Sequence, residues 1–316
     1  MSWSRPAPDA LVGRVLCGRY RVVQLLGSGG VGDVYLVERA GARPPARLAL
    51  KVLRAEHRRT PAIVARFERE AEAAARVRHT SVLRVEPLER DADVPCFAME
   101  LLLGLDLADT LAAARSLVPA RAVRIAAEVA SGLAAAHRAG VIHRDVKPEN
   151  LFLVHAPDGR ELVKVLDFGL SFLRGQDPLP RPGEGGPSSS PALPPWRVMG
   201  TPEYLAPELG RGAAPSPGSD VYALGIVLFE MIAGRAPFVG PAASVLEQHL
   251  REPVPPLYRL YPGLLVSRDL DAAVRKALIK DPHARFSSMD ELRAALIDTP
   301  EATEHRVRAC QDGRVG

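Results

Sequence analysis

Cysteine is scarce in this sequence, and Cys17, Cys96 and Cys310 lie far apart without a C-x-x-C pair. This spacing argues against a disulfide framework and against a zinc site. Long apolar runs are also missing, because the longest, residues 221–234, is shorter than the ~20 residues of a membrane span and contains Glu230. The first ten residues lack the apolar core of a secretory signal. These absences predict a cytoplasmic protein without a membrane span.

The sequence also has almost equal numbers of basic and acidic residues. Lys and Arg number 41 against 37 for Asp and Glu, which gives a formal net charge of +4. The densest basic cluster, residues 54–69, is interpreted as a solvated helix face, and no nucleic-acid partner is expected. Hydrophobic residues make up 47% of the 316 positions, enough for one large domain or two lobes with a packed core.

Alternation and helical periodicity change along the chain. Strands are expected at residues 20–26, 34–38, 48–53 and 96–101. Helices are expected at residues 62–78, 120–138, 221–233 and 289–297. A strand-rich first third followed by a helix-rich remainder predicts an α+β protein with two unequal lobes.

Two segments have little capacity to form a core. Residues 174–195 contain seven prolines and four glycines among 22 positions, a composition that predicts a flexible insertion. Residues 299–316 are polar and are expected to fray.

The stretch GSGGVGDV at residues 27–34 has the glycine spacing G-x-G-x-x-G. A Walker-type phosphate loop is excluded, because Asp33 stands where that motif needs lysine. A dinucleotide fingerprint needs a strand and then a helix, whereas both flanking segments here are expected to be strands. The glycines therefore belong to a hairpin turn, and this motif alone fits either a tight turn or a kinase glycine-rich loop.

The remaining parts of a kinase signature follow in order. They are Lys51 in LALK, Glu70 in a helical segment, HRDVKPEN at 143–150, LDFG with Asp167, Phe168 and Gly169, and Ala206-Pro207-Glu208 after GTPEY. With these elements the sequence resembles the eukaryotic-like Ser/Thr protein kinases of bacteria over residues 20–298.

The resemblance implies a bilobal protein kinase fold of the α+β class. Its small β-rich N-lobe with one main helix would be residues 20–102, and its larger, mostly helical C-lobe residues 103–298. Residues 1–19 would form an N-terminal extension, 174–195 an insertion in the activation segment and 299–316 a C-terminal tail.

The resemblance also implies an ATP site. Backbone N–H groups of the glycines would approach the phosphates, Val34 and Ala49 would contact the adenine, and Asp106 would bind the ribose. Met99 would be the gatekeeper, and the backbones of Glu100 and Leu102 would bond the adenine edge. The full set of implied nucleotide-binding residues is Leu26, Gly27, Ser28, Gly29, Gly30, Gly32, Val34, Ala49, Lys51, Met99, Glu100, Leu102, Asp106, Asn150, Phe152 and Asp167.

The implied catalytic residues are Asp145, Lys147, Lys51, Glu70 and Thr201. Asp145 would orient or accept the proton of the attacking hydroxyl, and Lys147 would neutralise charge on the γ-phosphate. Asn150 and Asp167 supply hard oxygen ligands suited to Mg²⁺, or to Mn²⁺ in its place.

Further residues match structural features of the family. Glu208 and Arg285 match a buried ion pair, and Asp220 and Gly225 match the helix that anchors the catalytic loop. His143 would stack with Phe168 and have a structural role rather than that of a general base. Lys147 and Thr201 both favour Ser/Thr over tyrosine substrates.

The expected function is ATP-dependent phosphorylation of Ser/Thr hydroxyls in bacterial signalling, by a non-specific serine/threonine protein kinase. Its expected partners are ATP, a protein substrate and a second copy of itself in trans. Two alternatives are a pseudokinase scaffold and a small-molecule kinase. The first normally loses Lys51, Asp145 or Asp167, and the second lacks the GTPEY and Ala-Pro-Glu segments. No threonine occurs between Asp167 and Thr201. Two outcomes are therefore open: Ser188–Ser190 form a phosphorylated switch that would bind Arg144, or the loop is held active without phosphate.

Overall fold

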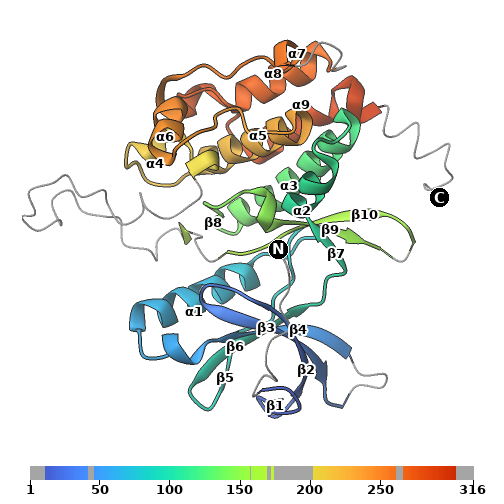
Figure 1. Ribbon diagram of the computed structural model, residues 1–316, viewed down its shortest axis with the longest axis vertical. Coiled ribbons are helices and arrows are strands. Elements are labelled where there is room, and N and C mark those ends of the chain that lie inside the picture. The colour runs from blue at the N-terminus through green and yellow to red at the C-terminus, as the bar shows by residue number, and fades with distance from the viewer. Residues whose placement is uncertain are drawn as a thin grey trace, which may run out of the picture. The chain divides into compact units, whose positions relative to one another are not determined.

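The computed structural model describes residues 11–41, 46–156, 158–168, 172–173, 202–260 and 266–303. The chain divides into two compact units (Figure 1). The first unit runs to Arg78 and adds Leu83–Leu102 and Asp167–Gly169. The second unit consists of His79–Val82, Leu103–Leu166 and the chain from Leu170 onward.

The first unit is built on a six-stranded antiparallel sheet in the order β1-β2-β3-β4-β6-β5. Its strands are β1 Val15–Leu16, β2 Tyr20–Ser28, β3 Gly32–Arg39, β4 Ala46–Leu53, β5 Glu89–Asp91 and β6 Val94–Glu100. Neighbours along the chain pair with each other except where helix α1, Pro61–Arg76, lies between β4 and the β5–β6 hairpin.

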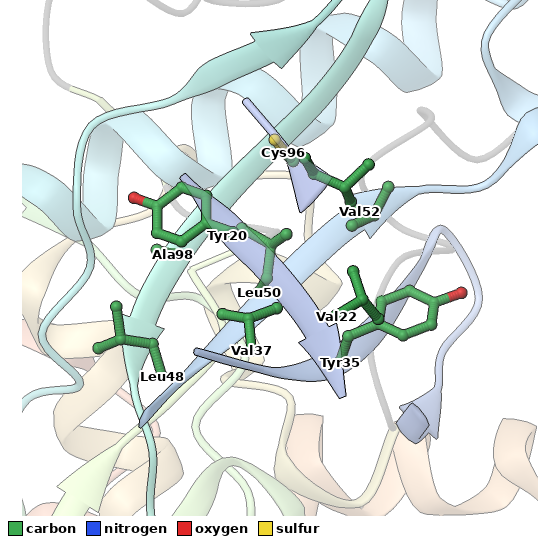
Figure 2. Packing of buried hydrophobic residues seen from close by; sticks show 10 residues of the cluster. Tyr20, Val22, Tyr35, Val37, Leu48, Leu50, Val52, Cys96 and Ala98 are labelled. Carbon is green, nitrogen blue, oxygen red and sulfur yellow. The ribbon is translucent and has the colours of Figure 1, made fainter. Parts of the chain in front are cut away.

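The two faces of this sheet have different roles. Because side chains alternate along a strand, opposed residues share a face. One face forms a closed hydrophobic cluster (Figure 2) made of Leu16, Tyr20, Val22, Tyr35, Val37, Leu48, Leu50, Val52, Cys96 and Ala98. On the other face Leu53 and Phe97 pack against Phe67 and Ala71 of α1. Phe67 and Phe97 lie 5.1 Å apart between ring centroids.

The second unit is mostly helical. Its α-helices are α2 Leu107–Ala114, α3 Pro119–Arg138, α4 Pro207–Gly210, α5 Pro217–Ala233, α6 Ala242–Arg251, α7 Leu257–Leu260, α8 Arg268–Ala277 and α9 Met289–Ile297. Proline occupies the first turn of α1, α3 and α5, where its missing N–H has no helical partner to lose.

Helix α5 is the core of the second unit, because it is buried on nearly all sides. A capping box of Ser216 and Ser219 begins it, and left-handed Gly234 ends it. Gly225 allows α8 to approach, since a Cβ there would lie 3.0 Å from the Cβ of Ala277 and 3.0 Å from Leu278.

Short strands support the loops of this unit. They are β7 Gly104–Asp106, β8 Val141–Ile142, β9 Leu151–His155, β10 Glu161–Val165 and β11 Phe172–Leu173. β9 lies between β10 and β7, and β11 pairs with β8. Only glycine fits at position 104, because β7 and β9 approach closely and a Cβ there would lie 1.9 Å from the Leu153 carbonyl oxygen.

The predicted α+β class is confirmed, with the strands in the first part of the chain and the helices in the second. The expected long elements are present within a few residues, but helix α1 begins only at Pro61, so residues 54–60 of the basic cluster precede it. The bounds assigned to the two lobes, the extension and the tail stay predictions. Among the described residues, no helix is long and apolar enough to cross a membrane.

Candidate active site

The glycine stretch closes the β2–β3 hairpin, as the flanking strands predict. Gly27 lies opposite Val34 and Ser28 opposite Asp33, and the Gly29 N–H donates to the Gly32 carbonyl at 3.0 Å. A Cβ on Gly32 would lie 2.8 Å from the Val52 carbonyl oxygen, so packing within the sheet requires this glycine. Among the residues that the structure describes, none lies within 4 Å of a Cβ on Gly27 or Gly30. Packing against the described part of the chain therefore does not explain those two glycines, whereas close approach of a ligand would.

Several predicted nucleotide-binding residues share the α1 face of the sheet. Val34 lies opposite Lys51, and Ala49 lies opposite Met99. Because Lys51 and Ala49 are two residues apart on β4, all four side chains point to the same side. Leu26 is the most exposed of the predicted apolar contacts, at 36%.

Lys51 forms an ion pair with Glu70 of α1. Glu70 is buried, and this burial raises the pKa of its carboxyl above the ordinary value, with the charge of Asp167 adding to the rise while Lys51 opposes it. The three charged groups thus influence one another within the first unit. Asp167 has left-handed backbone, with φ of 53°, which is strained for a residue other than glycine.

The end of β6 carries the predicted adenine-binding segment. The Glu100 N–H already donates to the Arg84 carbonyl at 3.1 Å, and the Glu100 carboxylate accepts from the Arg84 N–H at 2.7 Å. A contact from the Glu100 backbone to adenine therefore falls to its carbonyl oxygen. Leu102 is the last residue of this part of the first unit.

The loop between β8 and β9 brings Asp145, Lys147 and Asn150 together. The Lys147 Nζ lies 2.8 Å from the Asp145 Oδ2. The Asn150 Nδ2 donates to the same Oδ2 at 3.0 Å and to the Asp145 carbonyl at 2.7 Å. Because Nδ2 is used in this way, Asn150 keeps its Oδ1, the atom of the amide that can bind a cation.

His143 has both ring nitrogens in use. Its Nδ1 accepts from the Asp145 N–H at 3.3 Å, so its Nε2 is the protonated nitrogen and donates to the Leu166 carbonyl at 2.8 Å. The ring is fully buried. A histidine bonded on both sides and shielded from solvent supports the loop and is not placed to take a substrate proton.

Asp220 of α5 holds the loop between β8 and β9 by hydrogen bonds to its backbone. Its carboxylate accepts from the backbone N–H groups of His143 and Arg144, both at 2.9 Å, and from the His137 Nε2 at 2.7 Å. Burial alone would raise the pKa of Asp220, but these hydrogen bonds lower it below the ordinary value. Arg144 has a strained φ of 70°, which the bond from its N–H to Asp220 helps to hold.

Asp106 and Phe152 are opposite each other on β7 and β9. The Asp106 Oδ1 accepts from the Asp109 N–H at 2.7 Å and so caps helix α2. The residue predicted to bind ribose thus has a structural role, and its position is fixed by the start of the helix.

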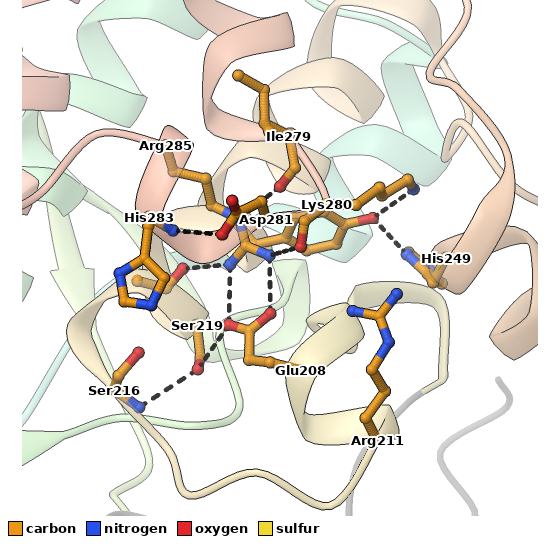
Figure 3. A network of polar contacts seen from close by, with 12 residues as sticks. Glu208, Arg211, Ser216, Ser219, His249, Ile279, Lys280, Asp281, His283 and Arg285 are labelled. Carbon is orange, nitrogen blue, oxygen red and sulfur yellow. Dashed lines mark hydrogen bonds and ion pairs between the residues drawn. The ribbon is translucent and has the colours of Figure 1, made fainter.

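The predicted pair of Glu208 and Arg285 forms a buried two-point contact at 2.7 and 2.8 Å (Figure 3). The guanidinium also donates to the carbonyls of Ile279, Lys280 and Gly218. All five of its N–H groups therefore have acceptors.

Tyr204 and Glu230 form a contact that the sequence analysis missed. The tyrosine hydroxyl donates to the Glu230 carboxylate at 2.7 Å. Burial and the nearby Glu230 raise the pKa of Tyr204, and the carboxylates of Glu149 and Glu203 add to this effect. The sequence holds no short-range signal for this group, because 26 positions separate the two residues. Three carboxylates therefore act on Tyr204, the last residue of GTPEY.

The predicted residues thus form two groups, one in each unit. Lys51, Glu70 and Asp167 belong to the first unit, and Asp145, Lys147 and Asn150 to the second. Thr201, Gly169 and Ser188–Ser190 lie outside the described residues. Within the described part of the chain, no cluster of three or more His, Cys, Asp or Glu side chains could hold a metal ion.

Residues 20–297 match the family model described as the protein kinase domain. The chain is 36% identical over 293 residues to the serine/threonine-protein kinase pkn3 of Myxococcus xanthus, with 92% of this chain and 52% of that protein covered. It is 37% identical over 298 residues to the serine/threonine-protein kinase PknB of Mycobacterium tuberculosis, with 91% and 44% covered. The chain therefore spans about half the length of these relatives, or less. The crystal structure of the PknI kinase domain from Mycobacterium tuberculosis has a TM-score of 0.65 at 28% identity, covering 91% of this chain and 98% of that one.

Proposed function

The chain belongs to the protein kinase family, and on that premise we propose that it transfers the γ-phosphoryl group of ATP to serine and threonine hydroxyls of proteins. The observation that carries the proposal is the grouping of Lys147 and Asn150 on one carboxylate oxygen of Asp145, at 2.8 and 3.0 Å. A loop that presents a carboxylate, an ammonium and an amide within six residues has the groups that phosphoryl transfer needs.

In this proposal the first unit supplies the contacts to the phosphates and to the adenine. Lys51, held by Glu70, contacts the phosphates, and the glycine hairpin covers them with backbone N–H groups. Val34, Ala49 and Met99 contact the adenine ring from the same face of the sheet. The Glu100 carbonyl and the Leu102 backbone bond its edge, while Leu26, Ser28 and Gly30 border it.

Asn150 and Asp167 are the residues that would hold Mg²⁺. Their donors are an amide oxygen and a carboxylate, which are the hard ligands that this ion prefers, and the Nδ2 contacts of Asn150 turn its Oδ1 away from Asp145. When bound, the ion neutralises part of the phosphate charge. Mn²⁺ accepts the same ligands and is proposed as a substitute.

Asp145 positions the attacking hydroxyl. Lys147 and Asn150 both contact its Oδ2, and we assign Oδ1 to the substrate hydroxyl. As the hydroxyl oxygen attacks, its proton passes to this carboxylate, and Lys147 shifts toward the oxygens of the phosphoryl group as their charge develops. Asp106 and Phe152 border the ribose.

Serine and threonine are the proposed acceptors because Lys147 follows Asp145 by two positions, as in Ser/Thr kinases of the family, and Thr201 agrees with this choice. Broad, non-specific acceptance of protein substrates and autophosphorylation in trans are part of the proposal. Because the reaction consumes ATP, we also propose that the domain works in the cytoplasm.

The proposal is tested by incubating the purified chain with radiolabelled ATP, Mg²⁺ and a basic acceptor protein, followed by phosphoamino-acid analysis. We expect phosphoserine and phosphothreonine from the wild-type chain and neither from the Lys51→Ala and Asp167→Ala variants. Lys276→Ala is the control and should keep both products, because the exposed ammonium of Lys276 pairs with Glu291 at 2.9 Å. Phosphotyrosine as the main product contradicts the substrate class, and unchanged transfer by Asp167→Ala contradicts the assigned roles. Nucleotide binding without transfer in the wild-type chain would identify a pseudokinase scaffold.

A further inference from the structure

Two cysteines that are far apart in the sequence lie side by side in the first unit. The Cys17 Sγ and the Cys96 Sγ are 3.2 Å apart, although 79 positions separate them. Cys17 lies in the turn between β1 and β2, and Cys96 lies in β6. A disulfide needs a sulfur–sulfur distance of about 2.0 Å. Small rotations of the two side chains would supply the remaining approach.

The backbone of Cys17 is held against the hairpin that carries Cys96. Its N–H donates to the Asp91 Oδ1 at 2.8 Å, and Asp91 is in β5, which pairs with β6 so that Glu89 lies opposite Cys96. Both thiols are therefore fixed to the same strand pair. Their closeness does not depend on a freely moving terminus.

The turn itself does not need a cysteine. Cys17 and Gly18 both have left-handed backbone, with φ of 50° and 64°, and the Arg19 N–H closes the turn on the Leu16 carbonyl at 3.1 Å. Glycine, asparagine or aspartate would adopt this conformation with less strain than cysteine does. The position therefore places a thiol beside Cys96 at a conformational cost.

The two thiols differ in access. Cys96 is 1% exposed and belongs to the hydrophobic cluster of the sheet (Figure 2), whereas Cys17 is partly exposed. A cavity of about 200 Å³ lies against Cys96, with Leu16 and Val52 also in its lining. This volume exceeds that of a water molecule several times, so a molecule of the size of hydrogen peroxide fits.

We propose that Cys17 and Cys96 are an oxidation site, at which a peroxide converts the two thiols into an intramolecular disulfide between the β1–β2 turn and β6. The Cys17 sulfur, as thiolate, attacks one peroxide oxygen, the O–O bond breaks, and a sulfenic acid and one water form once the released proton is taken up. The Cys96 sulfur then attacks the Cys17 sulfur, the S–O bond breaks, and the hydroxyl leaves with the Cys96 proton as a second water. Two thiols and one peroxide thus give one disulfide and two waters, and a dithiol reverses the change by exchange.

The reaction is slow at neutral pH. Burial raises the pKa of the Cys17 thiol, and the carboxylates of Glu89 and Asp91 raise it further. Burial also raises the pKa of Cys96. Because the thiolate is the reacting form, the site responds to sustained rather than brief oxidation. This role goes beyond the proposed phosphoryl transfer and uses none of its residues.

The test uses the full chain carrying Cys310→Ser, so that only these two thiols remain. The protein is treated with hydrogen peroxide, alkylated under denaturing conditions and analysed by intact mass and by non-reducing peptide mapping. We expect complete loss of both alkylatable thiols, a mass lower by about two hydrogens, a peptide linking Cys17 to Cys96, and full recovery of both thiols with dithiothreitol. The control variants Cys17→Ser and Cys96→Ser, each in the same background, should give no linked peptide.

Three results would overturn the proposal. The first is two free thiols after prolonged oxidation, and the second is a stable sulfinic acid on Cys17 with Cys96 still free. The third is a covalent dimer in place of the internal link. Because the measurement counts thiols and requires no phosphotransfer, its outcome is separate from that of the proposed function.

Discussion

Replacing Asp220 by asparagine tests how the loop that carries Asp145 is held. The carboxylate accepts the N–H groups of His143 and Arg144 with different oxygens, both at 2.9 Å. Asparagine has one acceptor oxygen, and its NH₂ group would face the other N–H as a second donor. At least one buried backbone N–H then loses its acceptor, and the left-handed conformation of Arg144 loses support.

The expected loss of unfolding free energy in Asp220→Asn follows from these contacts. A buried donor without a partner costs ~1–3 kcal/mol, and hydrogen bonds to a charged group contribute ~1.5–3 kcal/mol each. We therefore expect the free energy of unfolding to fall by about 2–4 kcal/mol. A loop displaced by a fraction of an ångström at Asp145 should also lower kcat roughly 10- to 100-fold.

The assay is urea unfolding of wild-type and Asp220→Asn protein at several pH values. The pKa of Asp220 is lowered in the folded chain, so its carboxylate contributes stability that is fully present above the unfolded value of about 3.9 and is lost as the pH falls through the folded pKa. The difference between the two proteins should be constant from pH 7 to 5 and should shrink below about pH 4.

Asp290→Asn is the matched control, since Asp290 contacts Arg138 at 2.9 Å on the surface with 64% of its side chain exposed. Its free energy of unfolding should change by less than about 1 kcal/mol. If Asp220→Asn matched this control at pH 7, or if its deficit persisted unchanged at pH 3.5, the reasoning on the loop anchor would be wrong.

Three further changes test the packing of the second unit by urea or thermal unfolding, and Gly30→Ala in the first unit is their control. Glu208→Ala leaves the fully buried Arg285 guanidinium without its carboxylate, and we expect a loss of about 3–5 kcal/mol; a loss below 1 kcal/mol would contradict the ion pair. Gly225→Ala adds a Cβ 3.0 Å from two side chains and should lower the free energy of unfolding by about 1–3 kcal/mol. Gly30→Ala adds a Cβ with no described atom within 4 Å and should change the free energy of unfolding by less than about 0.5 kcal/mol. Burial lowers the pKa of His249 to about 4, so the free energy of unfolding of the wild-type chain should fall as the pH drops from 6.5 toward 4. His249→Gln should reduce the slope of this free energy against pH by about one proton. Equal slopes in the two proteins would refute the lowered pKa of His249.

The fold class and the kinase resemblance could be predicted because their signals are local. Strands β2 to β4 have clear alternation, and the motifs from Lys51 to Glu208 are short segments in a fixed order. The likeness to kinase domains of known structure confirms the bilobal fold that the resemblance implied. Pairs such as Glu208 and Arg285 were accessible only through that resemblance.

Other features depend on tertiary contacts and left no local signal. The short strands β7 to β11 have two to five residues each, too few for a period to be recognised. Cys17 and Cys96 are far apart along the sequence. The register of β5 and β6 and the contact of Cys17 with Asp91 nevertheless bring their sulfurs together in the structure. The tautomer of His143 likewise follows from the positions of Asp145 and Leu166, which the sequence does not specify.

The most direct measurement compares phosphotransfer and nucleotide binding in wild-type, Asp145→Asn and Asp290→Asn protein with ATP and Mg²⁺. Asparagine keeps the shape of Asp145 and still contacts Lys147 and Asn150, but it takes no proton from a hydroxyl. We expect Asp145→Asn to bind ATP as the wild-type chain does, while its rate of Ser/Thr phosphorylation falls at least ~100-fold. Asp290→Asn should match the wild-type chain in both measurements. Transfer by Asp145→Asn at the wild-type rate would contradict the central claim.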